Sequence, residues 1–370
     1  VYKRQRLHGF MLDGISERNC ALRGSPVFHY PFVERRPGEA DGLIQALASR
    51  AACVVSDDFP AFFLPKWVSG EADAAGVPFD LVDSNGLIPL RAPEKVFSAA
   101  YHFRRYLQRN LLDHLPESPE VDPLQAPIPP FEPEALDDLQ ERWPTADGER
   151  LQGGVEALRD LPLDSTVGLA PTAGTSEAAL KTLRSFLNEG LGRYAEDRNH
   201  PDAGATSGLS PFLHFGTLSS HQVFSEVSGW EGWTPLRLSE QSNGAREGWW
   251  GMGPGAEAFL DQLITWRELG FNMCAYREDY AEYRSLPEWA RTTLGVHQGD
   301  PRAHLYEYDD FRAAGTHDPL WNAAQRQLVE EGTIHNYLRM LWGKKILEWT
   351  ASPVDALEIM LDLNDRFALD

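Results

Sequence analysis

The sequence has few cysteines, and this shortage limits the kind of protein that it encodes. Its 370 residues include three, Cys20, Cys53 and Cys274, which are widely separated and lack the spacing of a metal site or of a disulfide framework. We therefore expect a reducing, cytoplasmic setting and no bound metal. The chain also lacks a run of about 18 apolar residues that could span a bilayer, so we expect no contact with a membrane.

Basic residues are outnumbered by acidic ones, 34 to 55, which gives a formal net charge of −21. This charge argues against a broad, non-specific attraction to nucleic acid, because that attraction depends on neutralising phosphates. It leaves room for a local basic patch, for which Lys344 and Lys345 are candidates. Tryptophan is abundant by contrast, with eleven residues, and a ring of that size suggests uses beyond filling a core.

The first 115 residues alternate between strand and helix signals. Apolar runs and turn residues predict strands at 27–30, 53–55 and 79–82, and helices at 42–52 and 98–115. Strands separated by helices imply a parallel sheet, so we expect a Rossmann-like α/β domain over residues 1–115. No Gly-x-Gly-x-x-Gly follows any of these strands, so the sequence does not predict that this domain binds a dinucleotide.

Residues 116–150 are rich in proline and acidic side chains, which predicts a linker on the surface. After this linker the strand signals disappear, and we expect an all-helical domain over residues 151–370. Capping residues before proline predict three helix starts, at Ser210-Pro211, Asp318-Pro319 and Ser352-Pro353. Gly190 and Gly332 are typical of helix ends, and residues 228–255 of a long loop.

Residues 206–216 place three hydroxyls and a glycine directly before a predicted helix start. Hydroxyls and free backbone N–H groups at a helix N-terminus bind anions, and a phosphate suits them. An ordinary serine cap produces the same pattern, and it is the commoner explanation for such a segment taken alone.

A helix predicted over residues 335–349 carries an unusual stripe. Steps of three and four residues place its members on one face: His335, Arg339, Trp342, Ile346 and Trp349. A plain core stripe would be aliphatic throughout, because an unpaired buried arginine is strongly destabilising. We therefore expect a flat, polar group to lie against this face.

Two further helices carry aromatic side chains. In residues 259–270, Gln262 and Trp266 lie one helical turn apart and can face one cavity, although a core tryptophan and a surface glutamine are the plainer interpretation. In residues 317–325, Trp321 follows a capped helix start, where a packed tryptophan is again the default interpretation.

Taken together and in order, four segments resemble the flavin domain of the photolyase and cryptochrome family: residues 206–216, 259–272, 317–325 and 335–370. The chain is most similar to class II cyclobutane pyrimidine dimer photolyases. That similarity comes through His-Asp-Pro-Leu-Trp-Asn-Ala-Ala-Gln at 317–325, Arg-Met-Leu-Trp-Gly-Lys-Lys-Ile-Leu-Glu-Trp at 339–349 and Leu-Asn-Asp-Arg at 363–366.

This resemblance implies a fold and an activity. The fold is an α/β antenna domain that carries a deazaflavin or folate pigment, followed by an all-helical domain that binds FAD. The activity is the light-driven repair of cyclobutane pyrimidine dimers in DNA, by electron transfer from reduced FAD. The implied protein is a cytoplasmic monomer whose partner is UV-damaged DNA.

The resemblance also implies roles for single residues. The pyrophosphate of FAD contacts Thr206, Ser207, Gly208, Leu209 and Ser210, and Tyr194 adds an aromatic contact. Arg339 and Asp370 form an ion pair beside the flavin, and Asn364 faces its reactive nitrogen N5. Trp342, Trp321 and Trp349 are the electron-transfer triad, in order from the flavin to the surface.

Gln262, Trp266 and Met340 match the pocket that receives the flipped dimer. At Gln262 the family pattern has a carboxylic acid, which can transfer a proton, whereas an amide can only donate a hydrogen bond. Two alternatives stay open: a cryptochrome-like photoreceptor that signals through a partner, and a helical protein that has lost FAD. The family pattern extends beyond both ends of the sequence, which we therefore interpret as a fragment.

Overall fold

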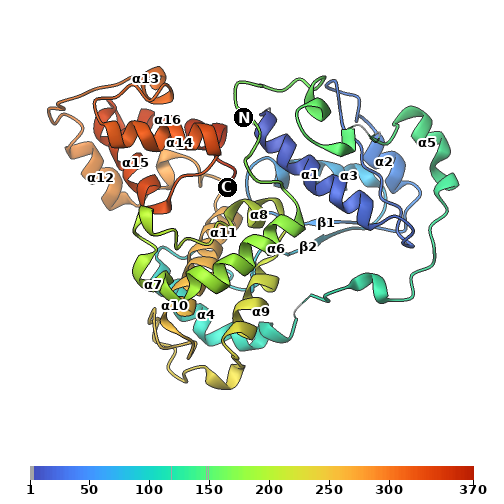
Figure 1. Ribbon diagram of the computed structural model, residues 1–370, viewed down its shortest axis with the longest axis horizontal. Coiled ribbons are helices and arrows are strands. Elements are labelled where there is room, and N and C mark those ends of the chain that lie inside the picture. Colours follow the sequence, from blue (N-terminus) through green and yellow to red (C-terminus); the bar gives the residue numbers. More distant parts are fainter. Residues whose placement is uncertain (1–3, 118, 147, 149) are drawn as a thin grey trace.

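The structure is a computed structural model that describes residues 4–117, 119–146, 148 and 150–370. Its elements form three groups, and the C-terminus lies near the middle of the molecule, where the groups approach one another (Figure 1). The first group contains helices α1 Gln5–Ala21, α2 Leu43–Ala48, α3 Leu64–Ala75 and α5 Asp137–Arg142, and strands β1 Val54–Asp57 and β2 Phe79–Val82.

The two strands are parallel, with Val54 opposite Phe79, and they are the whole sheet among the residues that the structure describes. Both were predicted. The third predicted strand, residues 27–30, is wrong, because this stretch is an irregular chain whose rings pack inward instead of pairing. The hydroxyl of Tyr30 donates a hydrogen bond to the carbonyl of Trp143. Two strands do not confirm a Rossmann-like domain.

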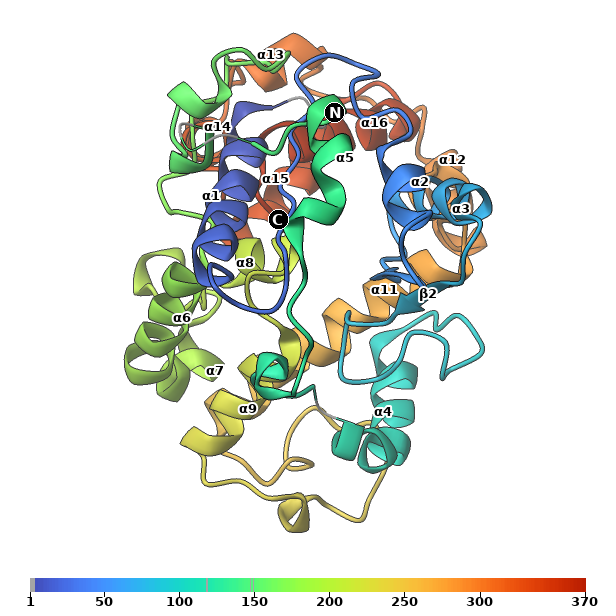
Figure 2. The ribbon, with the colours of Figure 1, turned by 90° about the vertical axis from the view of Figure 1, so that its right-hand side faces the viewer.

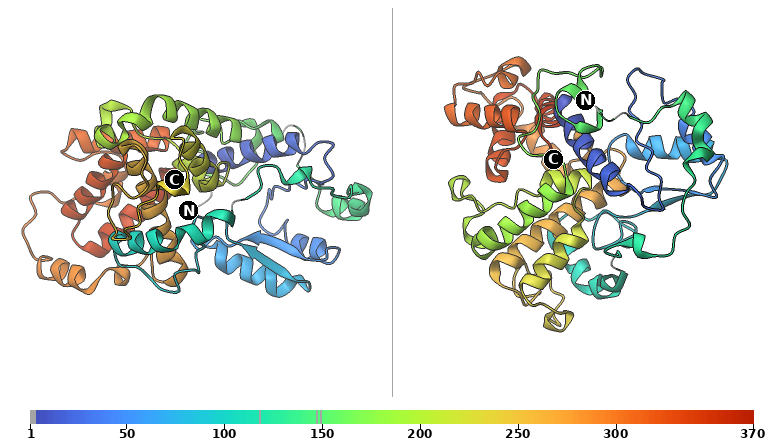
Figure 3. Two further views of the ribbon diagram at one scale, coloured as in Figure 1. Left: turned by 90° about the horizontal axis from the view of Figure 1, so that it is seen from below. Right: turned by 45° about the vertical axis from the view of Figure 1, so that its right-hand side comes forward.

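The described residues between the end of α4 and α5 run along the outside of the molecule (Figures 2 and 3). Most of the side chains before residue 136 are exposed. The far end of the segment packs inward, where Leu136, Leu139 and Trp143 are buried together with Leu43 of α2. The predicted linker therefore also contributes side chains to a small core that it shares with α2.

The second group holds the largest core. Its helices are α4 Ala100–His114, α6 Ser176–Ser185, α7 Tyr194–Asp197, α8 Ser210–Phe215, α9 Ser220–Trp230, α10 Pro254–Leu260 and α11 Arg267–Tyr276. Helix α1 joins this core from the first group, since the ring of Phe10 lies 5.6 Å from that of Phe212 and 5.0 Å from that of Phe215. The loop predicted over 228–255 is confirmed between α9 and α10, with one short helical turn at Pro235–Arg237, whereas its first three residues belong to α9 and its last two to α10.

The third group contains α12 Glu288–Val296, α13 Tyr308–Arg312, α14 Pro319–Glu331, α15 Asn336–Trp349 and α16 Pro353–Phe367. Two predicted caps are confirmed: Asp318 accepts hydrogen bonds from the first turn of α14, and Ser352 from that of α16. Gly332 ends α14 as predicted. No helix in the described part of the chain is long and apolar enough to cross a bilayer.

Two predictions about helix ends are wrong. Ser210 is the first residue of α8 and not its cap, a position that Leu209 occupies. Gly190 does not end a helix, because the chain continues in a helical turn through Arg193. A Cβ at Gly190 would lie 2.7 Å from the ring of Phe186, so close packing explains this glycine.

Arg6 of α1 ties the N-terminus to the third group. Its side chain is buried, at 1% exposure, and it donates hydrogen bonds to five carbonyls: those of Gly168, Leu328, Val329, Glu330 and Phe367. Four of these belong to the last turns of α14 and α16, which present unpaired carbonyls and the negative end of each helix dipole. The guanidinium therefore caps two helices at once.

Candidate functional site

Three buried tryptophans form a chain inside the third group. The ring centroid of Trp321 lies 6.3 Å from that of Trp342, with the planes 3° apart, and 6.1 Å from that of Trp349, with the planes at 66°. The three side chains are between 3 and 4% exposed. Trp321 thus lies between the other two, which is the order that the resemblance implied.

Hydrogen bonds fix the two stacked rings. The indole N–H of Trp342 donates to Oε1 of Gln325 over 2.8 Å, and that of Trp321 donates to the carbonyl of Trp342 over 3.1 Å. Buried indole N–H groups need such partners. Gln325, which is fully buried, was not predicted as a site residue. Its place in the 317–325 motif, one turn after Trp321, was the available signal.

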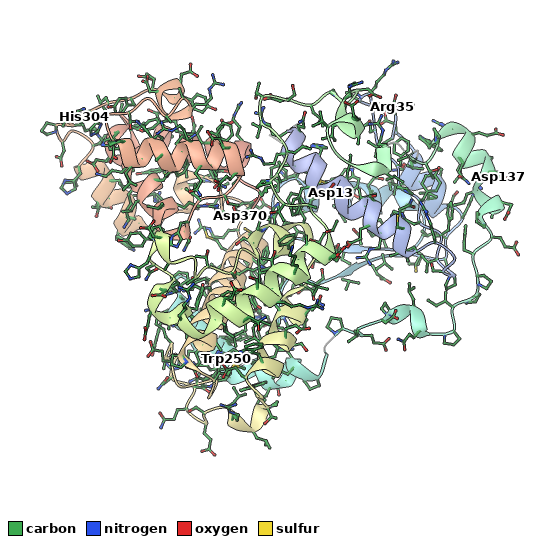
Figure 4. The ribbon with its side chains drawn as sticks, viewed as in Figure 1. Asp13, Arg35, Asp137, Trp250, His304 and Asp370 are labelled. Atoms are coloured by element: carbon green, nitrogen blue, oxygen red, sulfur yellow. The ribbon has the colours of Figure 1, made fainter. Side chains whose placement is uncertain are left out.

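The position of the last of the three tryptophans, Trp349, differs from the prediction. Trp349 was expected to reach the surface, but it is 3% exposed because residues 304–317 fold over it. The rings of Tyr306 and His317 lie 6.0 and 4.8 Å from its own, and the ammonium of Lys345 lies 5.4 Å from its ring centroid. His304, at the outer edge of this group, is exposed (Figure 4).

Arg339 and Asp370 form the predicted ion pair, with 2.7 Å between Nη2 and Oδ1. Asp370 lies near the centre of the molecule (Figure 4). It also lies near α8: burial lowers the pKa of His214, the Asp370 carboxylate opposes that shift, and Arg267 adds to it. His214 is nevertheless exposed. Asp370 and Arg267, which belong to two of the segments that resemble the family, therefore both lie close enough to His214 to act on its charge.

The hydroxyl segment 206–210 has the form of an open anion cradle. Gly208 has a φ of +66°, a left-handed conformation that side chains other than glycine rarely adopt. The oxygen of Ser207 accepts the N–H of Leu209, and Leu209 itself is buried. Thr206 and Ser210 are exposed, and no group in the described chain hydrogen-bonds their hydroxyls. Two free hydroxyls beside a left-handed turn fit a pyrophosphate.

His335 lies at the start of α15, the helix that carries Arg339. Its Nδ1 caps α15 by accepting the N–H of Tyr337 over 3.2 Å, so Nε2 carries the ring proton. Burial lowers the pKa of the imidazole, and a hydrogen bond with the backbone of Arg198 opposes that shift. His335 therefore ties the start of α15 to the residue that follows α7.

Tyr194 lies in the main core rather than on an open wall. Its ring meets those of Phe186 and Phe259 edge to face, at 5.6 and 5.5 Å, and the Arg198 guanidinium lies 5.8 Å from its centroid. Burial raises the pKa of its hydroxyl. Its predicted contact with a cofactor stays a prediction.

The residues assigned to the dimer face outward. Trp266 is 47% exposed and Met340 49%, while Gln262 is partly buried, so the plainer interpretation of Trp266 as a core residue is wrong. Gln262 and Trp266 belong to a π-helical segment, Asp261–Trp266, between α10 and α11. Asn364 is half-buried on α16, where its amide hydrogen-bonds the carboxyl of Asp365.

Comparisons with solved structures support the fold. The chain is similar to a bacterial class III photolyase from Agrobacterium tumefaciens, with a TM-score of 0.62 and 16% identity, over 97% of this chain and 70% of that one. At this identity the likeness concerns the fold alone, and it confirms a photolyase fold. No family model matches the chain.

Curated proteins named deoxyribodipyrimidine photo-lyase are similar in sequence. The protein from Methanothermobacter thermautotrophicus is 32% identical over 99% of this chain and 72% of its own length. Those from Oryza sativa subsp. japonica and Potorous tridactylus are 31 and 34% identical, over 99 and 86% of this chain and 68 and 54% of their own lengths. The prediction from the four motifs is confirmed: the chain belongs to the deoxyribodipyrimidine photo-lyase family.

Proposed function

We propose that this chain repairs cyclobutane pyrimidine dimers in DNA with light, as a class II-like photolyase that uses FAD. The observation that carries the proposal is the buried row of tryptophans, in which Trp321 of α14 lies between Trp342 and Trp349 of α15, the helix that also carries Arg339. Relatives named as DNA photolyases support light-driven repair, and they do not favour the photoreceptor alternative. The antenna pigment and a monomeric state stay predictions.

The cofactor would lie where the site segments converge. Its pyrophosphate would rest on residues 206–210, with Tyr194 nearby, and its ring system beside Arg339, Asp370 and Asn364. When bound and reduced, FAD supplies the light-excited electron that splits the dimer and receives it back afterwards. The Arg339–Asp370 pair orients its own guanidinium, because a carboxylate fixes the plane of an arginine.

The tryptophans would keep the cofactor in its reduced form. Rings packed about 6 Å apart pass single electrons inward, from Trp349 through Trp321 to Trp342. Their burial excludes water from the path, and the hydrogen bond to Gln325 holds the inner indole. Lys345, close to the outer ring, is paired with Glu348, whereas Lys344 is exposed and available to a DNA phosphate.

The dimer has to leave the base stack to reach this site, which costs less for a damaged base than for an intact one. Trp266 and Met340 offer exposed apolar surface against which the flipped bases pack. The Gln262 amide donates a hydrogen bond to a pyrimidine carbonyl but transfers no proton. Cleavage of the cyclobutane ring needs no net proton, so repair proceeds without an acid at this position.

Illumination tests the proposal directly. Protein loaded with FAD and chemically reduced is mixed with single-stranded DNA that contains dimers, and recovered monomers are counted in light and in darkness. We expect recovery in light alone. Trp266→Ala should abolish most of it, while Trp289→Ala, an exposed tryptophan on α12, should not. No recovery by the wild-type protein, with FAD fully bound and reduced, would reject the function.

A further inference from the structure

Two of the three side chains assigned to the dimer, Gln262 and Trp266, lie on a π-helical segment. Residues Asp261–Trp266 interrupt an otherwise α-helical run, α10 before them and α11 after them. Such segments are rare, and they often occur at functional sites. A π turn contains one residue more than an α-helical turn, so its persistence requires contacts that hold both of its ends.

The first end is held by a buried ion pair. Asp261 receives two hydrogen bonds from Arg104 of α4, over 2.7 Å from Nε and 3.2 Å from Nη2. Both side chains are 8% exposed. Arg104 also donates to the carbonyl of Gly244 over 3.2 Å. A paired guanidinium and carboxylate set distance and direction together, because the interaction is bidentate.

The second end is held by a buried carboxyl group. Glu268 accepts the N–H of Leu87 over 2.7 Å and the N–H of Ile88 over 3.3 Å. The loop closes tightly on it, since a Cβ at Gly86 would lie 2.5 Å from Cδ of Glu268. Only glycine at position 86 allows this approach.

Neighbouring contacts run in the same direction. The guanidinium of Arg267 donates to the carbonyl of Asn85. Asn272 accepts the N–H of Phe97 over 3.0 Å and donates to the carbonyl of Lys95 over 2.9 Å. Residues 85–104 therefore hydrogen-bond to the π-helical segment and α11, while Trp266 stays exposed to solvent.

We propose that Asp261 and Glu268 are positioning residues for recognition of the flipped dimer. If the segment relaxed to an α-helix, it would shift by one residue and turn either Gln262 or Trp266 by about 100° around the helix axis. Asp261 and Glu268, here called the two anchors, prevent this shift, because they hydrogen-bond to Arg104 and to the backbone of Leu87 and Ile88. The inference rests on the proposed function, since it concerns the same site.

Hydrogen exchange tests the anchoring without DNA. In Glu268→Gln, an amide NH2 replaces one of the two carboxyl oxygens, so one of the two backbone N–H groups loses its acceptor. We expect the amides of residues 261–266 in the FAD-loaded protein to exchange about tenfold faster. Glu257→Gln is the matched control, because Glu257 on α10 is also buried and accepts three loop N–H groups. Equal exchange in the two variants would overturn the inference.

Lesion selectivity tests its consequence. The double variant Arg104→Met with Asp261→Leu replaces the ion pair by apolar side chains of similar volume, which usually preserves folding. The ratio of Kd values for intact and dimer-containing DNA, measured in darkness, should fall about tenfold in this variant and in Glu268→Gln. FAD occupancy and the Glu257→Gln ratio should not change.

The outcomes separate the two claims. A wild-type protein that does not prefer dimer-containing DNA would contradict the proposed function and, with it, a role in recognition. A wild-type preference that both anchor variants retain would contradict the positioning role alone. A parallel loss of FAD and selectivity would identify the anchors as purely structural.

Discussion

The tryptophan chain and the π-helical segment hold their candidate functional residues in opposite ways. Trp342, Trp321 and Trp349 are buried, and ring packing with two hydrogen bonds fixes them in place. Trp266 is half exposed, and the polar contacts that fix its helix lie behind it.

The difference follows from what each group has to touch. An electron passes between packed rings, so a core can both hold and insulate them. A residue that meets a substrate has to be open before the substrate arrives, so its support comes from the other side of its helix. Directional polar contacts supply that support, because apolar packing alone permits rotation and sliding.

Breaking one anchor should produce the largest effect. Arg104→Met leaves the carboxylate of Asp261 buried without a partner, which should lower the free energy of unfolding by about 3–5 kcal/mol. Adding Asp261→Leu should recover most of the lost free energy of unfolding. Urea unfolding of the three proteins measures both steps. A double variant as unstable as the single one would show that packing, and not the ion pair, supports this helix.

The second anchor predicts a dependence on pH. Burial raises the pKa of Glu268 from 4.5 to about 8, against the opposing hydrogen bonds from Leu87 and Ile88. Between these values the folded chain keeps a proton that the unfolded chain has released, so the stability falls as pH rises through this window. It levels off above the folded pKa.

One proton limits this slope to about 1.4 kcal/mol per pH unit. Glu268→Gln has no such group, so the wild-type protein should lose more stability than the variant between these pH values. The difference between their unfolding midpoints, followed across the window, cancels other titrating groups. A constant difference would show that Glu268 is ionised throughout.

The tryptophan chain is tested by shortening it. Trp342→Phe nearly keeps the volume of the ring, so packing should survive, while photoreduction of bound, oxidised FAD should slow by at least about tenfold. Repair that starts from chemically reduced flavin should continue. Trp249→Phe is the control, because Trp249 is equally buried but lies outside the third group. Normal photoreduction in Trp342→Phe would make Trp342 a core residue only.

The smallest effect is expected for a substitution at Gln262 in the π-helical segment. Gln262→Glu restores an acid whose pKa burial can raise, so the yield of dimer repair should increase about two- to threefold. Monomer recovery under illumination measures it, with Gln241→Glu, at an exposed position between α9 and α10, as the control. An unchanged yield would show that position 262 contributes a hydrogen bond and no proton.

Local patterns carried much of the prediction. The strand at 79–82, the caps Asp318 and Ser352 and the end at Gly332 depend on residues close in the chain, and all of them are confirmed. The order of the tryptophans was implied by the resemblance of two motifs, at 317–325 and 339–349, to those of a known family.

The anchors lay beyond that reach. Arg104 and Asp261 are separated by 157 residues, and the N–H of Leu87 and Glu268 by 181, so no periodicity links them. Arg6 reaches carbonyls more than 320 residues away. In the sequence, charged side chains such as these are indistinguishable from surface charges, because their partners are far away along the chain.

By itself, the sequence determined the family and the helical nature of the second half, and it picked out the three tryptophans that the structure packs together, because these depend on composition and on spacing within local motifs. The tertiary structure alone decided that Trp349 is covered, that Trp266 is open and that a π turn separates two buried anchors. Burial and long-range polar pairing are properties of elements packed against one another, and no segment carries them before it meets its neighbours.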